Sequence, residues 1–300
     1  MLSYDFGYYI FEGGLYRKDE VLDLIEDLGG VVIQESVIGL DLVMFLAIPR
    51  VDVEKFSSLA YEVKAKLKEA KLIGSEVAVV PPSMSYRHLP HPACDINEYL
   101  RRYGAKTFMV GLARGVGQRR AQLTSYERSF LSEVDVAVFI MGNVEECIKR
   151  KVEMLRGLST PVVVVGGPEE VELPEHIAYV GGLGRVAHRL KLSDEVKALE
   201  RMVEAVGESL ERKRREFLED PPLFPPVLVK REIERQVEDA KDATVLKVEG
   251  VRVCLDYDEY SETIKNVVVE GRKLSEVADV KRSVHRNQII VKLLPESSLS

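Results

Sequence analysis

The chain has 300 residues, of which 46% are hydrophobic and 30% are charged, a composition typical of a folded protein with about two domains. Its 49 acidic residues outnumber 42 basic ones, and the formal net charge of -7 argues against general binding to nucleic acid. No apolar run approaches the roughly 20 residues that span a bilayer, and the N-terminus lacks the pattern of a signal peptide. We therefore expect a cytoplasmic protein that binds neither membranes nor nucleic acid.

Residues 1–82 have the pattern of a ferredoxin-like domain. Alternating apolar positions predict strands, and apolar residues spaced three and four apart predict helices. The expected strands are 4–12, 31–37, 40–48 and 76–80, and the expected helices are 18–28 and 53–70. This βαββαβ order is that of the split βαβ fold.

In residues 83–192 the pattern changes to helices and strands in alternation. The expected helices are 96–103, 120–131 and 145–155, and the expected strands are 107–112, 134–141, 161–165 and 177–180. Short strands that are apolar throughout, separated by amphipathic helices, indicate a parallel sheet covered on both faces. We predict a small doubly wound parallel α/β domain of the flavodoxin or Rossmann type.

The last third of the chain begins with a charged helix and a stiff linker, residues 193–226, in which PPLFPP presents Leu223 and Phe224 either to a partner or to the chain itself. Residues 227–300 follow as a small α+β domain, rich in strands. The predicted fold class is therefore α/β, or α+β when the chain is taken as a whole.

The segment HPACDINEY, residues 91–99, is the most informative motif. Prolines on both sides of His91 exclude a helix interior, so we expect Cys94 on an ordered loop. A thiolate with an imidazole from His91 or His88 is a soft ligand pair for iron or zinc. The alternative is structural, with Cys94 beside a helix start, and spacing alone favours it because one cysteine cannot complete a four-ligand zinc site.

The other cysteines carry a weaker signal. Three cysteines far apart, without a CxxC pair, argue against a disulfide framework or a self-contained cluster. Cys147 lies in an amphipathic helix and Cys254 in an alternating strand, so we expect both to be buried as small hydrophobic residues. Asp256, Asp258 and Glu259 resemble half of a calcium loop but lack its glycine and terminal glutamate.

The loop GLARGVGQRR, residues 111–120, follows a strand and is expected to open a helix. Backbone N–H groups freed by glycine, a helix N-terminus and arginine charge together favour binding of a phosphate or carboxylate. The candidate binding residues are Gly111, Arg114, Gly115, Gly117 and Arg119. The alternative is a tight turn with surface arginines. Glycine pairs that end neighbouring strands, at 166–167 and 181–182, should lie in the same crevice.

The segments HPACDINEY and GLARGVGQRRAQLTSYE, with the order of the blocks, resemble the methanogenesis marker protein 7 family over most of the chain. The resemblance implies a subunit of the ATP-dependent complex that activates methyl-coenzyme M reductase, the nickel-tetrapyrrole enzyme that releases methane in archaea. It implies a separate ATPase subunit and low-potential iron–sulfur chemistry that reduces nickel to Ni(I).

With this resemblance in view, Cys94, with His91 or His88, becomes a candidate ligand of a complex iron–sulfur cluster shared with partner subunits, and a purely structural thiol remains the alternative. Such a cluster does not need four cysteines from one chain, because sulfide bridges its other irons. We expect an accessory or electron-relaying subunit and not an enzyme by itself. The alternative is an independent sensor or enzyme for phosphorylated ligands, built on the 111–120 loop.

Overall fold

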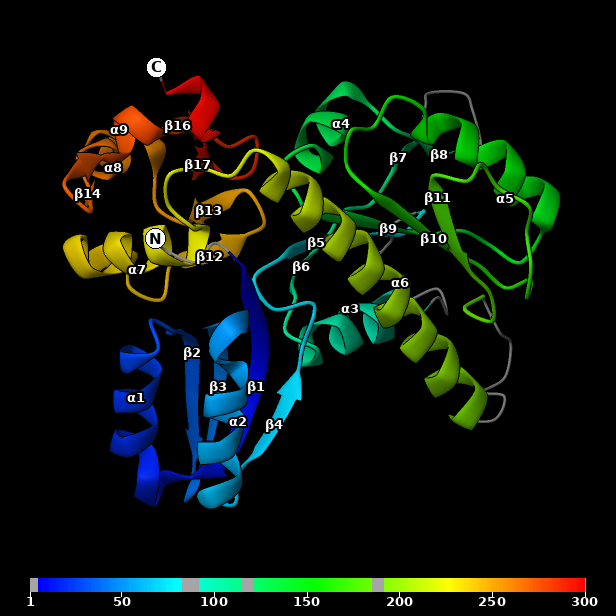
Figure 1. Cartoon of the computed structure of the whole chain (residues 1–300). Coiled ribbons are helices and arrows are strands. Elements are labelled where there is room, and N and C mark those ends of the chain that lie inside the picture. The colour runs from blue at the N-terminus through cyan, green and yellow to red at the C-terminus, as the bar shows by residue number, and fades with distance from the viewer. Residues whose placement is uncertain (1–4, 83–91, 115–120, 185–191, 300) are drawn as a thin grey trace. The chain divides into compact units, whose positions relative to one another are not determined.

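The computed structural model describes residues 5–82, 92–114, 121–184 and 192–299 (Figure 1). The chain divides into two compact units, Met1–Gly74 with Arg214–Ser300, and Ser75–Lys213. The division falls inside the long helix α6, Leu192–Glu219. Every helix in the described parts of the chain is too short or too polar to span a bilayer.

The N-terminal block is an antiparallel sheet of order β2-β3-β1-β4 with helices α1 and α2 on one face (Figure 1). Its elements are β1 Phe6–Gly14, α1 Lys18–Asp27, β2 Val31–Ile38, β3 Asp41–Pro49, α2 Val53–Glu62 and β4 Lys66–Glu69. Buried residues of β1, β3 and both helices form the core between sheet and helices, among them Phe11, Met44 and Phe56. The predicted βαββαβ order is present.

The second half of this block corrects the expected boundaries. The helix predicted for 53–70 ends at Glu62, and Lys64, at φ 55°, turns the chain into β4. Leu67 continues the helical spacing of the apolar residues, but it also fits an alternating strand, and pairing with β1 decides between them. The strand expected at 76–80 as the last of this sheet instead belongs to the central sheet.

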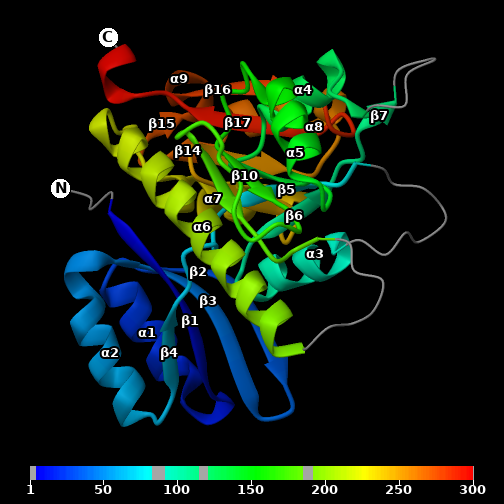
Figure 2. The same cartoon turned by 90° about the vertical axis from the view of Figure 1, so that its right-hand side faces the viewer.

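The central unit is a five-stranded parallel sheet of order β11-β10-β9-β5-β6. Its strands are β5 Glu76–Val80, β6 Lys106–Met109, β9 Val136–Ile140, β10 Val162–Val165 and β11 Ile177–Val180. Helix α3, Ala93–Arg102, covers one face, and helices α4, Ser125–Leu131, and α5, Glu145–Val152, cover the other (Figures 1 and 2). The predicted doubly wound parallel sheet is confirmed, and its order reverses between β5 and β9.

The C-terminal block is an antiparallel sheet of order β12-β13-β17-β16 with helices around it. Its elements are α7 Pro226–Gln236, β12 Thr244–Lys247, β13 Gly250–Val253, α8 Tyr257–Lys265, β14 Val268–Val269, β15 Arg272–Lys273, α9 Leu274–Val277, β16 Ala278–Arg282 and β17 Ile289–Leu293. Its core includes Phe6, Val31 and Ala47 of the N-terminal sheet, so the two blocks share one hydrophobic interior. Phe224 is buried in it and Leu223 packs against it, so the linker folds onto its own chain.

Two consecutive residues of α6 each bond within their own unit: Lys213 within the central unit and Arg214 within the other. Lys213 donates to Asp135 over 3.1 Å, and Asp135 is fully buried and also accepts from the Glu76 amide over 2.9 Å. Arg214 donates to the carbonyls of Lys71 and Ile73 and lies over the ring of Tyr8. The central unit therefore holds a buried charge whose cation comes from the helix.

Replacing Lys213 by methionine should lower the free energy of unfolding by about 3 kcal/mol, because it leaves the Asp135 carboxylate buried beside an apolar group. Adding Asp135→Asn should recover part of that loss. Urea unfolding followed by circular dichroism measures both. Lys197→Met, on an exposed turn of α6, is the matched control and should leave stability unchanged; an equal loss in both single variants would contradict the ion-pair explanation.

Candidate functional site

The predicted site residues lie on chain segments that follow the carboxyl ends of the central strands. In an open α/β sheet, ligands bind outside the carboxyl ends of the strands at the point where the strand order reverses. Here that point lies between β5 and β9. The chain leaving β5 leads into α3 with Cys94, and the chain leaving β6 leads into Gly111 and Arg114.

Cys94 is the second residue of α3 and its thiol is free and exposed. The helix begins at Ala93, three residues earlier than expected, so the cysteine lies on a helical turn and not on a loop. Ala93, Ile96 and Leu100 are fully buried and hold the opposite face of α3. The thiol is therefore presented to solvent by a rigid element. His88 and His91 lie outside the described residues.

The other two cysteines are less buried than predicted. Cys147 is half-buried in the first turn of α5, and Cys254 is exposed. The strand that was expected to bury Cys254 ends at Val253, so the cysteine has already left the core. In the described ranges, no three His, Cys, Asp or Glu side chains gather closely enough to hold a metal ion.

The 111–120 loop does not open a helix. Ala113–Arg114 forms the short strand β7, which pairs with β8, Ala121–Gln122. Helix α4 starts only at Ser125, so the helix expected at 120–131 begins five residues late. Gly115, Gly117 and Arg119 lie outside the described residues. A hairpin therefore separates Gly111 and Arg114 from the helix N-terminus that was expected to help them bind an anion.

The first turn of α4 is also closed by its own side chains. Thr124 and Glu127 form a capping box: the Thr124 amide donates to the Glu127 carboxylate over 2.6 Å, and the Glu127 amide donates to the Thr124 hydroxyl over 3.4 Å. These bonds satisfy amide groups that an anion would otherwise contact. Anion binding by Gly111, Arg114 and their neighbours stays a prediction that rests on glycine and arginine alone.

The glycines after β10 and β11 allow neighbouring loops to touch. A Cβ on Gly184 would lie 2.2 Å from Asn143 Oδ1 and 2.4 Å from the Gly167 Cα, and one on Gly181 would lie 2.3 Å from the Glu169 carbonyl oxygen. Backbone bonds join the same loops, with the Leu183 amide donating to the Gly166 carbonyl over 2.8 Å. Close packing therefore explains these glycines without a ligand. Gly142, after β9, has open space where a Cβ would stand.

Two tyrosines of this unit are held in the neutral form. Burial raises the pKa of Tyr179 to about 12, and its hydroxyl donates to the Pro168 carbonyl over 2.6 Å. On α3, burial and the neighbouring Tyr103 raise the pKa of Tyr99 to about 12. Neither phenol ionises near neutral pH, so neither is suited to exchange a proton with a ligand there.

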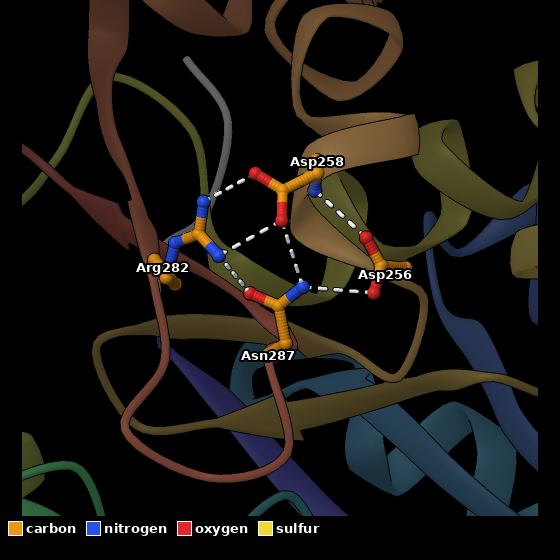
Figure 3. A network of polar contacts seen from close by, with 4 residues as sticks. All are labelled: Asp256, Asp258, Arg282 and Asn287. Atoms are coloured by element: carbon orange, nitrogen blue, oxygen red, sulfur yellow. Dashed lines mark hydrogen bonds and ion pairs between the residues drawn. The ribbon is translucent and has the colours of Figure 1, made fainter.

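Two of the three acidic residues that resembled a calcium loop, Asp256 and Asp258, belong to a hydrogen-bond network with Arg282 and Asn287 (Figure 3). Asp256 caps α8 by accepting from the Asp258 amide and also accepts from Asn287 Nδ2 over 2.8 Å. Arg282 donates to both carboxylate oxygens of Asp258 and to Asn287 Oδ1. The carboxylates of Asp256 and Asp258 thus accept hydrogen bonds from Arg282 and Asn287, and the network joins the β16–β17 turn to α8.

Comparison with known proteins gives the family. A family described as Methyl-coenzyme M reductase operon protein C matches residues 6–267. The chain belongs to this family. It is also 48% identical over 294 residues to the Methanocaldococcus jannaschii protein named Uncharacterized protein MJ0094, covering 96% of this chain and 94% of that one. The association with the reductase operon agrees with the expected link to methanogenesis and suggests partners related to the reductase.

Similar solved structures add no functional argument. Formyltetrahydrofolate deformylase from Burkholderia mallei matches at 9% identity and a TM-score of 0.20, over 49% of this chain and 65% of that chain. Glutamyl-tRNA reductase from Methanopyrus kandleri matches at 11% identity and a TM-score of 0.20, over 78% and 88%. Such scores are too low to transfer any property.

The glycine packing predicts opposite results at two neighbouring positions. Gly184→Ala should cost about 1–3 kcal/mol because its Cβ meets the backbone of Gly167. Gly142→Ala, where the space is open, is the matched control and should be neutral within about 0.5 kcal/mol. Chemical denaturation measures both. A neutral Gly184→Ala would show that the loops are not packed together as described.

The Arg282–Asp258 pair predicts a pH-dependent contribution to stability. Hydrogen bonds from Arg282 and Asn287 hold the pKa of Asp258 below its usual value of ~3.9. A depressed pKa stabilises the fold at pH values above the unfolded pKa, and this stabilisation is lost as the pH falls through the folded pKa. The difference in melting temperature between the wild type and Asp258→Asn should therefore be larger at pH 7 than at pH 3. A difference that does not change with pH would contradict this assignment.

Proposed function

We propose that the chain is an accessory subunit of the ATP-dependent complex that activates methyl-coenzyme M reductase, with the role implied by its resemblance to methanogenesis marker protein 7. In this role it helps hold, or relays electrons through, a complex iron–sulfur cluster used to reduce nickel to Ni(I). The observation that carries the proposal is an exposed thiol on the first turn of α3, in a chain of the reductase operon family.

The donor set of the described residues fits a shared cluster better than a site built by this chain alone. Cys94 offers one accessible sulfur at the carboxyl edge of the sheet, and no group of three metal-binding side chains forms among the residues that the structure describes. A complex cluster bridged by sulfide accepts single ligands from several chains. Cys94 would be this chain's ligand, with His91 or His88 as its predicted companion, and partner subunits would supply the rest.

The same edge exposes apolar side chains suited to a partner surface. Helices that follow parallel strands begin at the carboxyl edge of the sheet, and Tyr126 in the first turn of α4 and Val144 before α5 are both largely exposed there. Exposed aromatic and branched side chains in such a position are typical of protein contacts. A cluster held between Cys94 and a neighbouring subunit would be partly shielded from water by these contacts.

The alternative function, an independent sensor or enzyme for phosphorylated ligands, receives less support. It depended on a helix N-terminus next to the 111–120 loop, and the β7–β8 hairpin separates the two. Arg114 is part of the proposed binding loop, but no observation on the described residues favours this function over the first.

The proposal is tested by purifying the tagged chain from a methanogen under anaerobic conditions, with the proteins that accompany it. The wild type should recover the reductase or its associated subunits, together with iron and a low-potential EPR signal. Cys94→Ala should still recover the partners but lose iron and most of that signal, because a cluster ligand is missing.

Cys254→Ala is the matched control, since Cys254 is also exposed but belongs to the other unit of the chain. It should keep both partners and signal. Unchanged iron and EPR signals in Cys94→Ala would reject the ligand role, and recovery of the wild-type chain alone would reject membership of the complex.

A further inference from the structure

Strand β2 ends the N-terminal sheet and leaves one side open. The sheet order is β2-β3-β1-β4, and no strand in the described ranges pairs with the outer side of β2 (Figure 1). An edge strand presents unpaired backbone N–H and C=O groups that can pair with another chain. Natural edges are usually blocked by bulges, prolines, charged side chains or a covering helix.

The two halves of β2 differ in this protection. At its N-terminal half, Val31 packs in the core with α7, and the pairing with β3 is irregular between Val32 and Gln34. At its C-terminal half, residues 34–38 are all exposed and contain neither proline nor a basic residue. The unprotected edge is therefore one short, continuous segment.

The charge in this segment is already neutralised. Glu35 is the single ionised residue of QESVI, and Lys18 of α1 donates to its carboxylate over 2.5 Å. Glu35 and Val37 lie opposite Met44 and Leu42 of β3, so they are on the helix-covered face. An approaching strand therefore meets a neutral edge and not a repulsive one.

Large apolar side chains continue from this segment into the turn. Val37 is 45% exposed, Ile38 70% and Leu40 82%. Tyr16 is 74% exposed and lies next to the turn, where the Leu15 amide donates to the Leu40 carbonyl over 2.9 Å. Exposed apolar residues grouped beside an open strand are typical of an interaction surface.

We propose that the segment 34–38 pairs antiparallel with the same segment of a second copy of the chain. Two copies related by a twofold axis perpendicular to the sheet keep their helices on the same side, and the two sheets join through β2 into one. The most common protein assemblies have this symmetry. The pairing gives the unprotected backbone groups a partner and covers Val37 and Ile38.

Side-chain complementarity selects the register. Centred on Ser36, the pairing sets Ser36 opposite Ser36, Gln34 opposite Ile38 and Glu35 opposite Val37. Hydroxyl pairs across strands are favourable, and no like charges face each other. Centred on Glu35, it would place two carboxylates directly opposite, which is unfavourable. The sequence of the edge therefore favours the register centred on Ser36 and disfavours the register centred on Glu35.

The test uses the full chain and a pair of opposite charges at the centre of the interface. Sedimentation velocity over a range of concentrations should give wild-type particles with twice the chain mass of 33.8 kDa. Ser36→Glu and Ser36→Lys should each weaken self-association at least tenfold, because each places like charges directly opposite. An equimolar mixture of the two variants should restore the dimer, because glutamate then faces lysine.

Ser57→Glu, on an exposed position of α2, is the matched control and should dimerise as the wild type does. Circular dichroism checks that all four proteins are folded. A wild type that stays monomeric at every concentration overturns the proposal, as do Ser36 variants that dimerise normally. If the mixture remains monomeric while the wild type dimerises, the pairing centred on Ser36 is overturned.

Discussion

The arrangement of the central unit depends on one constraint: its strands are apolar at almost every position and must be covered on both faces. Residues of β5, β9 and β10 are buried along their whole length. Parallel strands all run in the same direction and are joined by crossover connections, which here include α3 on one face and α4 and α5 on the other. Every chain segment that leaves a strand therefore emerges at the same edge, which gathers Cys94, Gly111 and the glycine loops in one region although they are far apart in sequence.

The chemistry of that edge is set by how each helix begins. Helix α3 starts directly after Pro92 and exposes a thiol in its first turn, while its buried face holds the helix in place. Helix α4 caps its own first turn, where the Glu127 carboxylate accepts from the Thr124 amide and the Thr124 hydroxyl accepts from the Glu127 amide. The edge therefore presents an exposed thiol at one helix and a capped start at another, and the proposed role in holding a shared cluster rests on that thiol.

The other unit is organised by a core shared between the two ends of the chain. The first strand, Phe6–Gly14, contributes to the same interior as α7 and the C-terminal sheet. This shared core covers the N-terminal half of β2 but not its C-terminal half. The remaining open edge is thus a consequence of which strand ends the sheet and how far α7 reaches along it, since neither property belongs to β2 alone.

The amino-acid sequence by itself determined the mixed fold, because periodicity is a local property. The apolar runs 134–141 and 161–165 predicted strands whatever their neighbours in the sheet, and they contain β9 and β10. The family resemblance likewise rested on contiguous motifs. Only the tertiary structure decided that Leu67 lies in a strand, because pairing with β1 outweighs its helical spacing. It also decided that Cys254 leaves the core and that Gly184 is needed for close loop packing. Burial and backbone approach depend on residues distant in sequence, so no local pattern could have revealed them.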